Sequence, residues 1–293
     1  MNRPSERAAL TAMVVAMILW GATFVVIRDS VAGLAPALMV GTRFLVAAAL
    51  FGVALLLRRQ SIVAVDFWGG LGSGVFVLGG YYFQAEGLRT AAAGTSAFLT
   101  CAGTLLAAFF AWPLLKQRPT RMLTAGILLA MAGSGILSLR GSGFHLGRGE
   151  LLTLLGASMY ALQIVFVSRV ARTADSLTLA FAQSLLVACV LLPFAHDARG
   201  AFAALDRAGW QRLAYLAVAG STVAPMLQLT AQRTLPAGRV ALLFALEPVF
   251  ALLFALTLGG EQFALRWWIG AAMILSAVLL VEWRAAAARP STT

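Results

Sequence analysis

The stretch QAEGLRTAAAGTSAFLTCAGTLLAAFFA, residues 84–111, recurs 144 residues later as QLTAQRTLPAGRVALLFALEPVFALLFA, residues 228–255. Ten of the 28 aligned positions are identical, including the pattern QxxxxRT followed by AG. Alanine-rich apolar helices match by chance, but identical polar and glycine positions at one spacing indicate an internal repeat. The repeat decides the fold, because two copies of one sequence pattern predict two copies of one set of elements.

The composition around this repeat is that of a membrane protein. Of the 293 residues, 61% are apolar and 11% are charged, whereas soluble domains average about 45–50% apolar and about 25% charged. A soluble fold would have to expose large apolar patches. The net charge of +11 is spread in small groups between apolar runs. Such spacing is typical of topology anchors, so we expect no nucleic-acid partner.

Ten apolar segments are long enough for a membrane-spanning helix, which needs about 20 residues. In chain order, these predicted spans 1 to 10 are residues 8–27, 37–57, 67–88, 92–115, 122–139, 150–170, 175–195, 210–233, 237–258 and 265–283. If both termini are cytoplasmic, thirteen basic residues lie on the cytoplasmic side and eight on the other. This bias favours cytoplasmic termini. The sequence thus predicts an all-α integral membrane protein.

The repeat divides the ten spans into two units of five, residues 1–140 and 141–293. A weaker match of residues 20–28 with residues 160–168 extends the repeat to the first span of each unit. Because five is odd, the second unit crosses the membrane in the opposite sense to the first. Inverted repeats of this kind are common in secondary transporters, whose substrate site lies near the midplane between the units.

Three ionisable residues lie inside predicted spans, where a charge costs roughly 2.5–3.5 kcal/mol on insertion scales. Arg43 and Glu86 have two interpretations: a structural ion pair, in which Glu86 could instead use Arg89, or contact of Arg43 with a substrate carboxylate. Glu247 precedes Pro248, which predicts a helix kink. Glu247 is either a structural glutamate or part of a proton relay.

Aromatic and amide side chains inside the spans are candidates for a cavity wall. A buried tyrosine hydroxyl or glutamine amide needs a partner, which a neighbouring helix or a wet cavity supplies. Such a cavity suits a solute with a flat or apolar body and polar ends, and core packing is the alternative for each residue. The candidates are Trp20, Arg43, Tyr82, Glu86, Phe98, Tyr160, Gln163, Gln183, Gln228 and Phe244. Tyr81 and Gln84 also lie within spans, and Pro225, at the position of Tyr81 in the repeat, predicts a second kink.

Other classes of protein have weak support. Cys101, Cys189, His145 and His196 form no metal-binding, disulfide or haem pattern, so we expect no metal and no cofactor. An intramembrane hydrolase needs a nucleophile and a base at depth. The spans contain no histidine, and their single aspartate, Asp175, lies at an end, so we expect no enzyme. A channel would more often show rings of charged or carbonyl groups.

The motifs and their order resemble the drug/metabolite transporter superfamily, in its EamA-like family. The similarity rests on residues 20–24 (WGATF), 86–90 (EGLRT), 246–250 (LEPVF) and Gly260–Glu261, and it covers nearly the whole chain. Related first repeats often carry a proline in span 4, where this chain has Gly103 and Thr104, which leaves the symmetric kinking of spans 4 and 9 open.

The resemblance implies a secondary transporter of the bacterial inner membrane. It would export small metabolites by alternating access through a central cavity between the repeats. Among family members, the chain looks most like an exporter of aromatic and other apolar amino acids. The alternatives are a broad drug/metabolite exporter with another substrate, and a membrane channel. We expect a small-molecule substrate and the lipid bilayer as partners, and a monomer.

Overall fold

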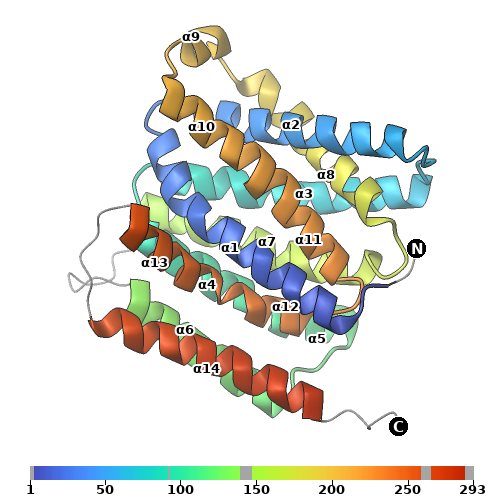
Figure 1. Ribbon diagram of the computed structural model, residues 1–293, viewed down its shortest axis with the longest axis vertical. Helices are drawn as coiled ribbons and strands as arrows, with labels where there is room; N and C mark the ends of the chain where they lie inside the picture. The colour runs from blue at the N-terminus through green and yellow to red at the C-terminus, as the bar shows by residue number, and fades with distance from the viewer. Residues whose placement is uncertain (1–2, 92, 139–146, 259–264, 288–293) are drawn as a thin grey trace.

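Helices make up nearly all of the described part of the computed structural model, residues 3–91, 93–138, 147–258 and 265–287, and no strand occurs in these ranges. They run side by side, and α1 begins at the same end of the bundle at which α14 ends (Figure 1). The helices of the first half are α1 (Glu6–Ser30), α2 (Pro36–Leu57), α3 (Ala64–Gly87), α4 (Ala93–Leu105), α5 (Ala107–Leu115) and α6 (Arg121–Ser138).

The second half begins with two long helices and then becomes more broken. Its helices are α7 (Arg148–Val170), α8 (Ser176–Leu191), α9 (Ala198–Ala203), α10 (Arg207–Tyr215), α11 (Ala224–Ala231), α12 (Ala237–Phe244), α13 (Glu247–Leu258) and α14 (Leu265–Ala287). A short 3₁₀ turn, Leu192–Phe194, follows α8, and a π-helical segment, Leu216–Val223, joins α10 to α11. The boundary predicted between residues 140 and 141, His145 and the motif Gly260–Glu261 lie outside the described residues.

Eight helical segments of the described chain are long and apolar enough to cross a membrane. The two predicted spans that are not among these eight are spans 3 and 5, which correspond to α3 and α6. Glycine and tyrosine lower the hydropathy of α3, and the apolar part of α6, Arg121–Ile136, is shorter than a full span. The count of ten spans and their inverted arrangement therefore stay predictions.

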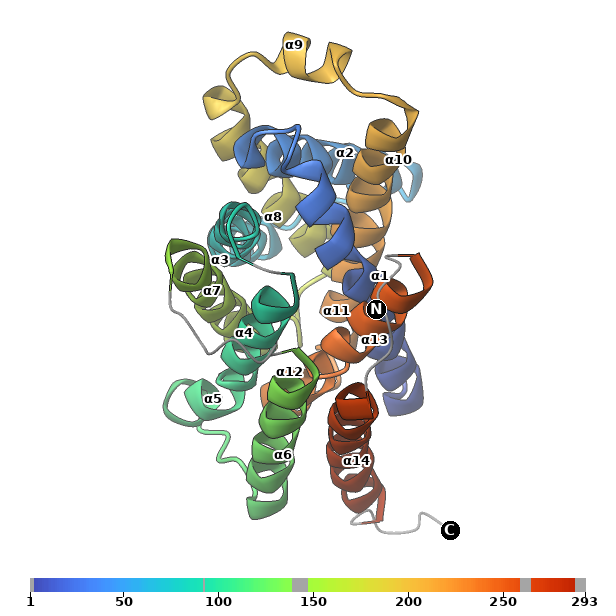
Figure 2. The same ribbon diagram turned by 90° about the vertical axis from the view of Figure 1, so that its left-hand side faces the viewer.

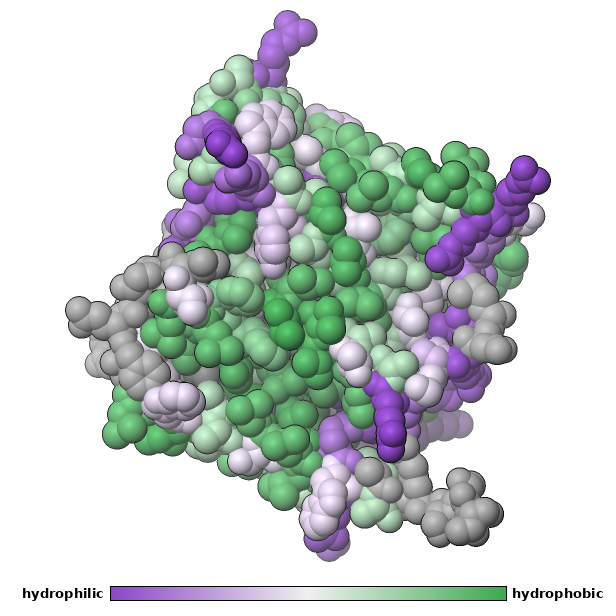
Figure 3. Space-filling view, in the orientation of Figure 1, coloured by the Kyte–Doolittle hydropathy of each residue, from purple (hydrophilic) through white to green (hydrophobic). Residues whose placement is uncertain are grey.

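The outer surface fits a lipid environment. Hydrophobic side chains cover the middle of the face seen in Figure 3, and hydrophilic side chains gather toward its edges. Leu56, Leu57 and Leu279 are among the large apolar side chains that are more than 60% exposed. Exposed apolar area on this scale would be unfavourable in water and is expected next to lipid tails.

Helix packing brings the two halves of the chain into close contact. α7 packs against α3 and α4, α1 packs against α11 and α13, and α2 packs against α8. α6 and α14 pair with each other, beyond α4 and α12 and away from α2 and α8 (Figure 2). Glycines permit this approach: a Cβ atom on Gly80 of α3 would overlap the ring of Tyr160 on α7.

Three helix breaks lie in the interior of the bundle. α12 ends at Phe244, and α13 begins at Glu247 with Pro248 in its first turn. Pro225 lies in the first turn of α11, directly after the π-helical segment. Both prolines that the sequence links to kinks thus lie at breaks. α4 and α5 are also separate, without a proline between them, because the Leu106 N–H bonds to the Gly103 carbonyl in a tighter turn (3.1 Å).

Candidate substrate cavity

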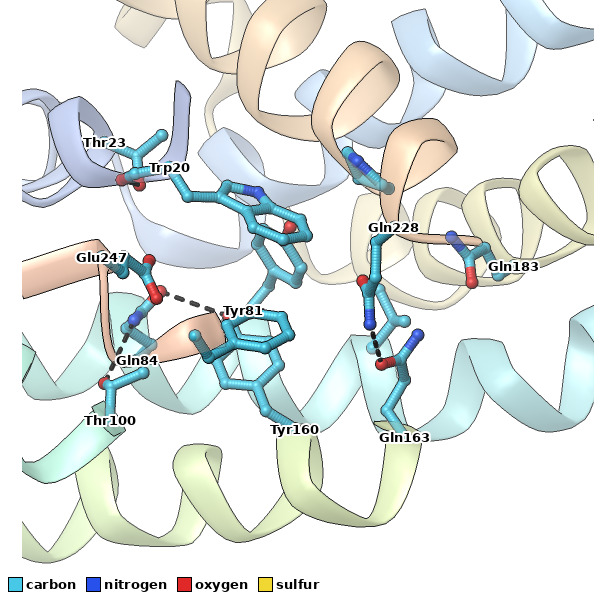
Figure 4. Close-up of a pocket in the computed structure, with 13 residues that line it drawn as sticks. Trp20, Thr23, Tyr81, Gln84, Thr100, Tyr160, Gln163, Gln183, Gln228 and Glu247 are labelled. Carbon is cyan, nitrogen blue, oxygen red and sulfur yellow. Dashed lines mark hydrogen bonds between the residues drawn. The ribbon is translucent and has the colours of Figure 1, made fainter. Parts of the chain in front are cut away.

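A narrow cavity lies in the interior of the bundle, between helices of both halves of the chain (Figure 4). Its volume is about 40 Å³, which is room for roughly three water molecules. Its wall is mainly aromatic and amide in character. The lining residues are Trp20, Thr23, Val77, Tyr81, Gln84, Thr100, Tyr160, Gln163, Gln183, Pro225, Gln228, Phe244 and Glu247.

Aromatic rings from four helices form the apolar part of the wall. Trp20 of α1 stacks on Phe244 of α12, with ring centroids 5.5 Å apart. Tyr81 of α3 meets Tyr160 of α7 edge to face at 5.4 Å. Offset-stacked and edge-to-face arrangements are the favourable ones for aromatic pairs. The rings therefore form a preorganised surface for a flat apolar group.

Gln84 connects α3 to α7 and to α4. Its Oε1 atom accepts a hydrogen bond from the Tyr160 hydroxyl (3.2 Å), and its Nε2 atom donates to the Thr100 hydroxyl (3.3 Å). Glu247 lines the same cavity and is 7% exposed. A carboxylate at this depth is costly, so Glu247 is the residue of the wall that most requires an explanation.

A second polar cluster joins α7 to α11. Gln228 Nε2 donates to Oε1 of both Gln163 and Gln232 (2.9 Å each). Gln232 Nε2 in turn donates to the Ile164 carbonyl and to the Ser168 hydroxyl. Amides that satisfy one another in this way hold two helices in register. Only part of this network lines the cavity.

The backbone carbonyl of Gly220 is the third polar feature. It accepts hydrogen bonds from Trp20 Nε1 (2.9 Å) and from the Tyr81 hydroxyl (3.2 Å). In the π-helical segment the Ala224 N–H bonds to the Ala219 carbonyl, five residues back. In the same five-residue pattern, the Gly220 carbonyl would accept a hydrogen bond from the N–H of residue 225. That residue is proline, which has no N–H. Pro225 thus leaves a carbonyl free for two side chains of the cavity.

Arg43 lies behind this wall and not in it. Its side chain is fully buried, and its Nε donates to the Ser221 hydroxyl (2.6 Å). The guanidinium lies 5.0 Å from the centre of the Tyr81 ring, within cation–π distance. An ion pair between Arg43 and Glu86 was one interpretation of the sequence, and the structure does not contain it. Glu86 instead contacts Arg89 at 3.4 Å, near the end of α3.

The structure brings together most of the residues predicted for a cavity. Those that line it are Trp20, Tyr160, Gln163, Gln183, Gln228 and Phe244, with Pro225 and Glu247. The lining does not include Arg43, Tyr82, Glu86, Phe98 or Pro248.

The choice between Tyr81 and Tyr82 shows why sequence reasoning fell short. Adjacent residues on a helix point about 100° apart, so only one of the two tyrosines can face the cavity. That one is Tyr81, while the ring of Tyr82 contacts Phe83. The repeat contains the missing signal, because Gln84 aligns with Gln228 and Tyr81 aligns with Pro225. No sequence signal marks Val77 or Thr100 among many similar residues, and Thr23 is marked only by its place in the WGATF stretch, residues 20–24.

Comparisons with known proteins agree with this architecture. The model of the EamA-like transporter family matches residues 7–139 and again residues 147–283. An "Uncharacterized transporter" of Archaeoglobus fulgidus is 29% identical over 267 residues, which are 91% of this chain and 83% of that protein. The "Uncharacterized inner membrane transporter YedA" of Escherichia coli K12 is 28% identical over 279 residues, 90% of this chain and 87% of that protein. A solved crystal structure with 20% identity superposes with a TM-score of 0.78 and covers 99% of this chain and 100% of that one, so the two share a fold.

Proposed function

The chain belongs to the EamA-like transporter family, and we propose that it exports aromatic and other apolar amino acids by alternating access. It is a multi-pass protein of the bacterial inner membrane. The observation that carries the proposal is the cavity between the two halves of the chain, with stacked rings, amides and one carboxylate in its wall. A cavity of this composition suits a solute with an apolar body and polar ends.

The proposed units are residues 1–140 and 141–293, and the two ranges matched by the family model support this division. The first unit contributes six residues to the cavity wall and the second contributes seven. Helix packing supports an inverted repeat as well. α1 packs on α11 and α13, and its counterpart α7 packs on α3 and α4. A site between two such units is where rocking of one unit against the other changes access.

The small volume of the cavity supports a transport cycle with a closed state. A space of about 40 Å³ is far below the roughly 300 Å³ or more of typical ligand pockets. An amino acid would enter only if helices of the two units separated. The glycines of α3 support such a movement. Met159, Tyr160 and Phe166 of α7 lie against Gly79, Gly80 and Gly72, so at these points α3 has no side chain of its own that must be displaced when the helices separate.

The test is counterflow in liposomes that contain the purified protein. Unlabelled phenylalanine inside should accelerate the uptake of labelled phenylalanine, and leucine inside should do the same. A carrier shows this exchange because its site faces one side at a time, whereas a channel does not. Gln228→Ala should slow exchange, and Gln117→Ala, outside the cavity, should leave it unchanged. Exchange of other metabolites without any exchange of amino acids would contradict the proposed substrates and favour a broad drug/metabolite exporter.

A pH gradient across the same liposomes tests the proposed role of Glu247 in proton coupling. If Glu247 carries a proton, net flux depends on the gradient, and Glu247→Gln removes that dependence while exchange continues. Net flux that ignores the gradient would instead assign facilitated transport to the protein and a structural role to Glu247.

A further inference from the structure

An unpaired cation is buried directly behind the cavity wall. Arg43 is 0% exposed, and within the part of the chain that the structure describes neither Nη1 nor Nη2 has a hydrogen-bond partner. A buried charge is strongly unfavourable unless it is paired and its donors are satisfied. No acidic side chain among the described residues is hydrogen-bonded to the guanidinium, so its two free nitrogens can still bind an anionic group from outside the protein.

The neighbours of Arg43 explain only part of its stabilisation. The Ser221 hydroxyl accepts a hydrogen bond from Nε, and the rings of Tyr81 and Phe44 lie 5.0 and 6.0 Å from Cζ. Glu86 is engaged by Arg89. These contacts leave the outer fork of the guanidinium free. Two parallel N–H donors in a plane match the paired oxygens of a carboxylate or of a phosphate, and of these two groups the carboxylate is the one that an amino acid carries.

The free fork lies next to the cavity. A Cβ atom built on Gly220 would lie 2.7 Å from Arg43 Nη2 and 3.1 Å from the Thr23 methyl group. Thr23, which like Arg43 Nη2 lies beside Gly220, and Tyr81, whose ring lies beside the guanidinium, both line the cavity. The Tyr81 hydroxyl donates to the Gly220 carbonyl (3.2 Å), and its ring packs edge to face on Phe44 at 4.8 Å and on Tyr160 at 5.4 Å. The Tyr81 ring thus lies both beside the guanidinium and in the cavity wall, so a displacement of Tyr81 when the helices of the two units separate would expose the guanidinium to the cavity.

We propose that Arg43 is the carboxylate-binding group of this cavity, which makes its substrates compounds with a carboxylate beside an apolar body. The proposal rests on the function proposed above, because it takes the cavity to be the transport site. It adds a chemical selection that the aromatic wall does not make: amines and neutral compounds of the same shape bind less well than acids.

A matched pair of compounds tests this selection. 3-Phenylpropionate and phenethylamine share a phenyl ring and a two-carbon chain and differ in the charged group. With the purified wild-type protein, the acid should raise the melting temperature at a concentration at least about tenfold lower than the amine does, since a hydrogen-bonded charge supports such a ratio. In Arg43→Gln the advantage of the acid should vanish. The advantage of the acid should persist in Arg89→Gln, which alters an arginine just after the end of α3.

The outcomes separate this proposal from the function proposed above. Exchange of labelled phenylalanine together with equal stabilisation by acid and amine would overturn the role of Arg43 and leave amino-acid export intact. Preference for the acid without any exchange of phenylalanine would support Arg43 and overturn amino-acid export. The comparison of 3-phenylpropionate with phenethylamine on the wild-type protein tests the role of Arg43 even if Arg43→Gln fails to fold. Ser221→Ala, which retains the arginine but releases its Nε, should then reduce the preference.

Discussion

α3 and the segment from α10 to α11 hold corresponding places in the sequence repeat, yet their structures differ. α3 is one unbroken helix, whereas its counterpart contains a π-helical segment and a proline. At the aligned position α3 has Tyr81 and the broken segment has Pro225. The proline leaves the Gly220 carbonyl without a helical donor, and the tyrosine donates to that carbonyl. The wall of the cavity thus depends on a difference between two similar sequences and not on their similarity. π-Helical turns are rare and often lie at functional sites, which agrees with this role.

The largest effect is expected where the broken segment approaches Arg43 most closely. In Gly220→Leu, the new side chain would overlap Arg43 Nη2 and the Thr23 methyl group, and overpacking at a buried site costs up to about 3 kcal/mol. Unfolding of the purified protein in denaturant measures the loss. Gly33→Leu is the control, because no atom lies within 4 Å of a Cβ built at that position. Equal losses in both variants would contradict the tight approach.

Pro225→Ala makes the broken segment more like α3. The new N–H at residue 225 can bond to a carbonyl of the π-helical segment and compete with Trp20 and Tyr81. We expect exchange of phenylalanine to fall by about tenfold, the equivalent of one hydrogen bond, with little loss of stability. Pro36→Ala is the control, since Pro36 lies in the first turn of α2, where the N–H has no helical acceptor. Unchanged exchange in Pro225→Ala would show that the free carbonyl is not needed.

Trp20→Phe removes one of the two donors to the free carbonyl. Phenylalanine retains a ring that can stack on Phe244, so the change removes the hydrogen bond of 2.9 Å together with the smaller ring of the indole. The free energy of unfolding should fall by about 1 kcal/mol. Trp283→Phe, at a tryptophan that is 67% exposed, should have no measurable effect. The same small effect in both variants would mean that the indole N–H contributes nothing.

Tyr81→Phe should have the smallest effect of the single changes. Its hydrogen bond is longer, at 3.2 Å, and the Gly220 carbonyl retains Trp20 as a donor. We expect a loss of about 0.5 kcal/mol. The double variant with Trp20→Phe should lose more than the sum of the two single losses, because the buried carbonyl then has no donor. Strict additivity would show that the two side chains do not share one acceptor.

The apolar segments and the motif order of the sequence led to the family, which the comparisons confirm. The helices follow the predicted segments closely, because about 20 consecutive apolar residues have few alternatives to a helix in a membrane. The breaks were harder to predict. Pro248 and Pro225 mark two of them, but no proline marks the separation of α4 from α5 at Leu106, which only the alignment of this stretch with the segment around Pro248 hinted at.

The sequence by itself thus determined a helical membrane protein with a repeated pattern, since hydropathy and polar identities can be read along one dimension. Only the tertiary structure decided that Tyr81 and not Tyr82 faces the cavity, that a carbonyl at Gly220 is free, and that no acid of the described chain is hydrogen-bonded to the Arg43 guanidinium. The physical reason lies in the surroundings of the helices. Residues that face lipid and residues that face other helices are both apolar, so hydropathy identifies a span without showing which side of it faces inward.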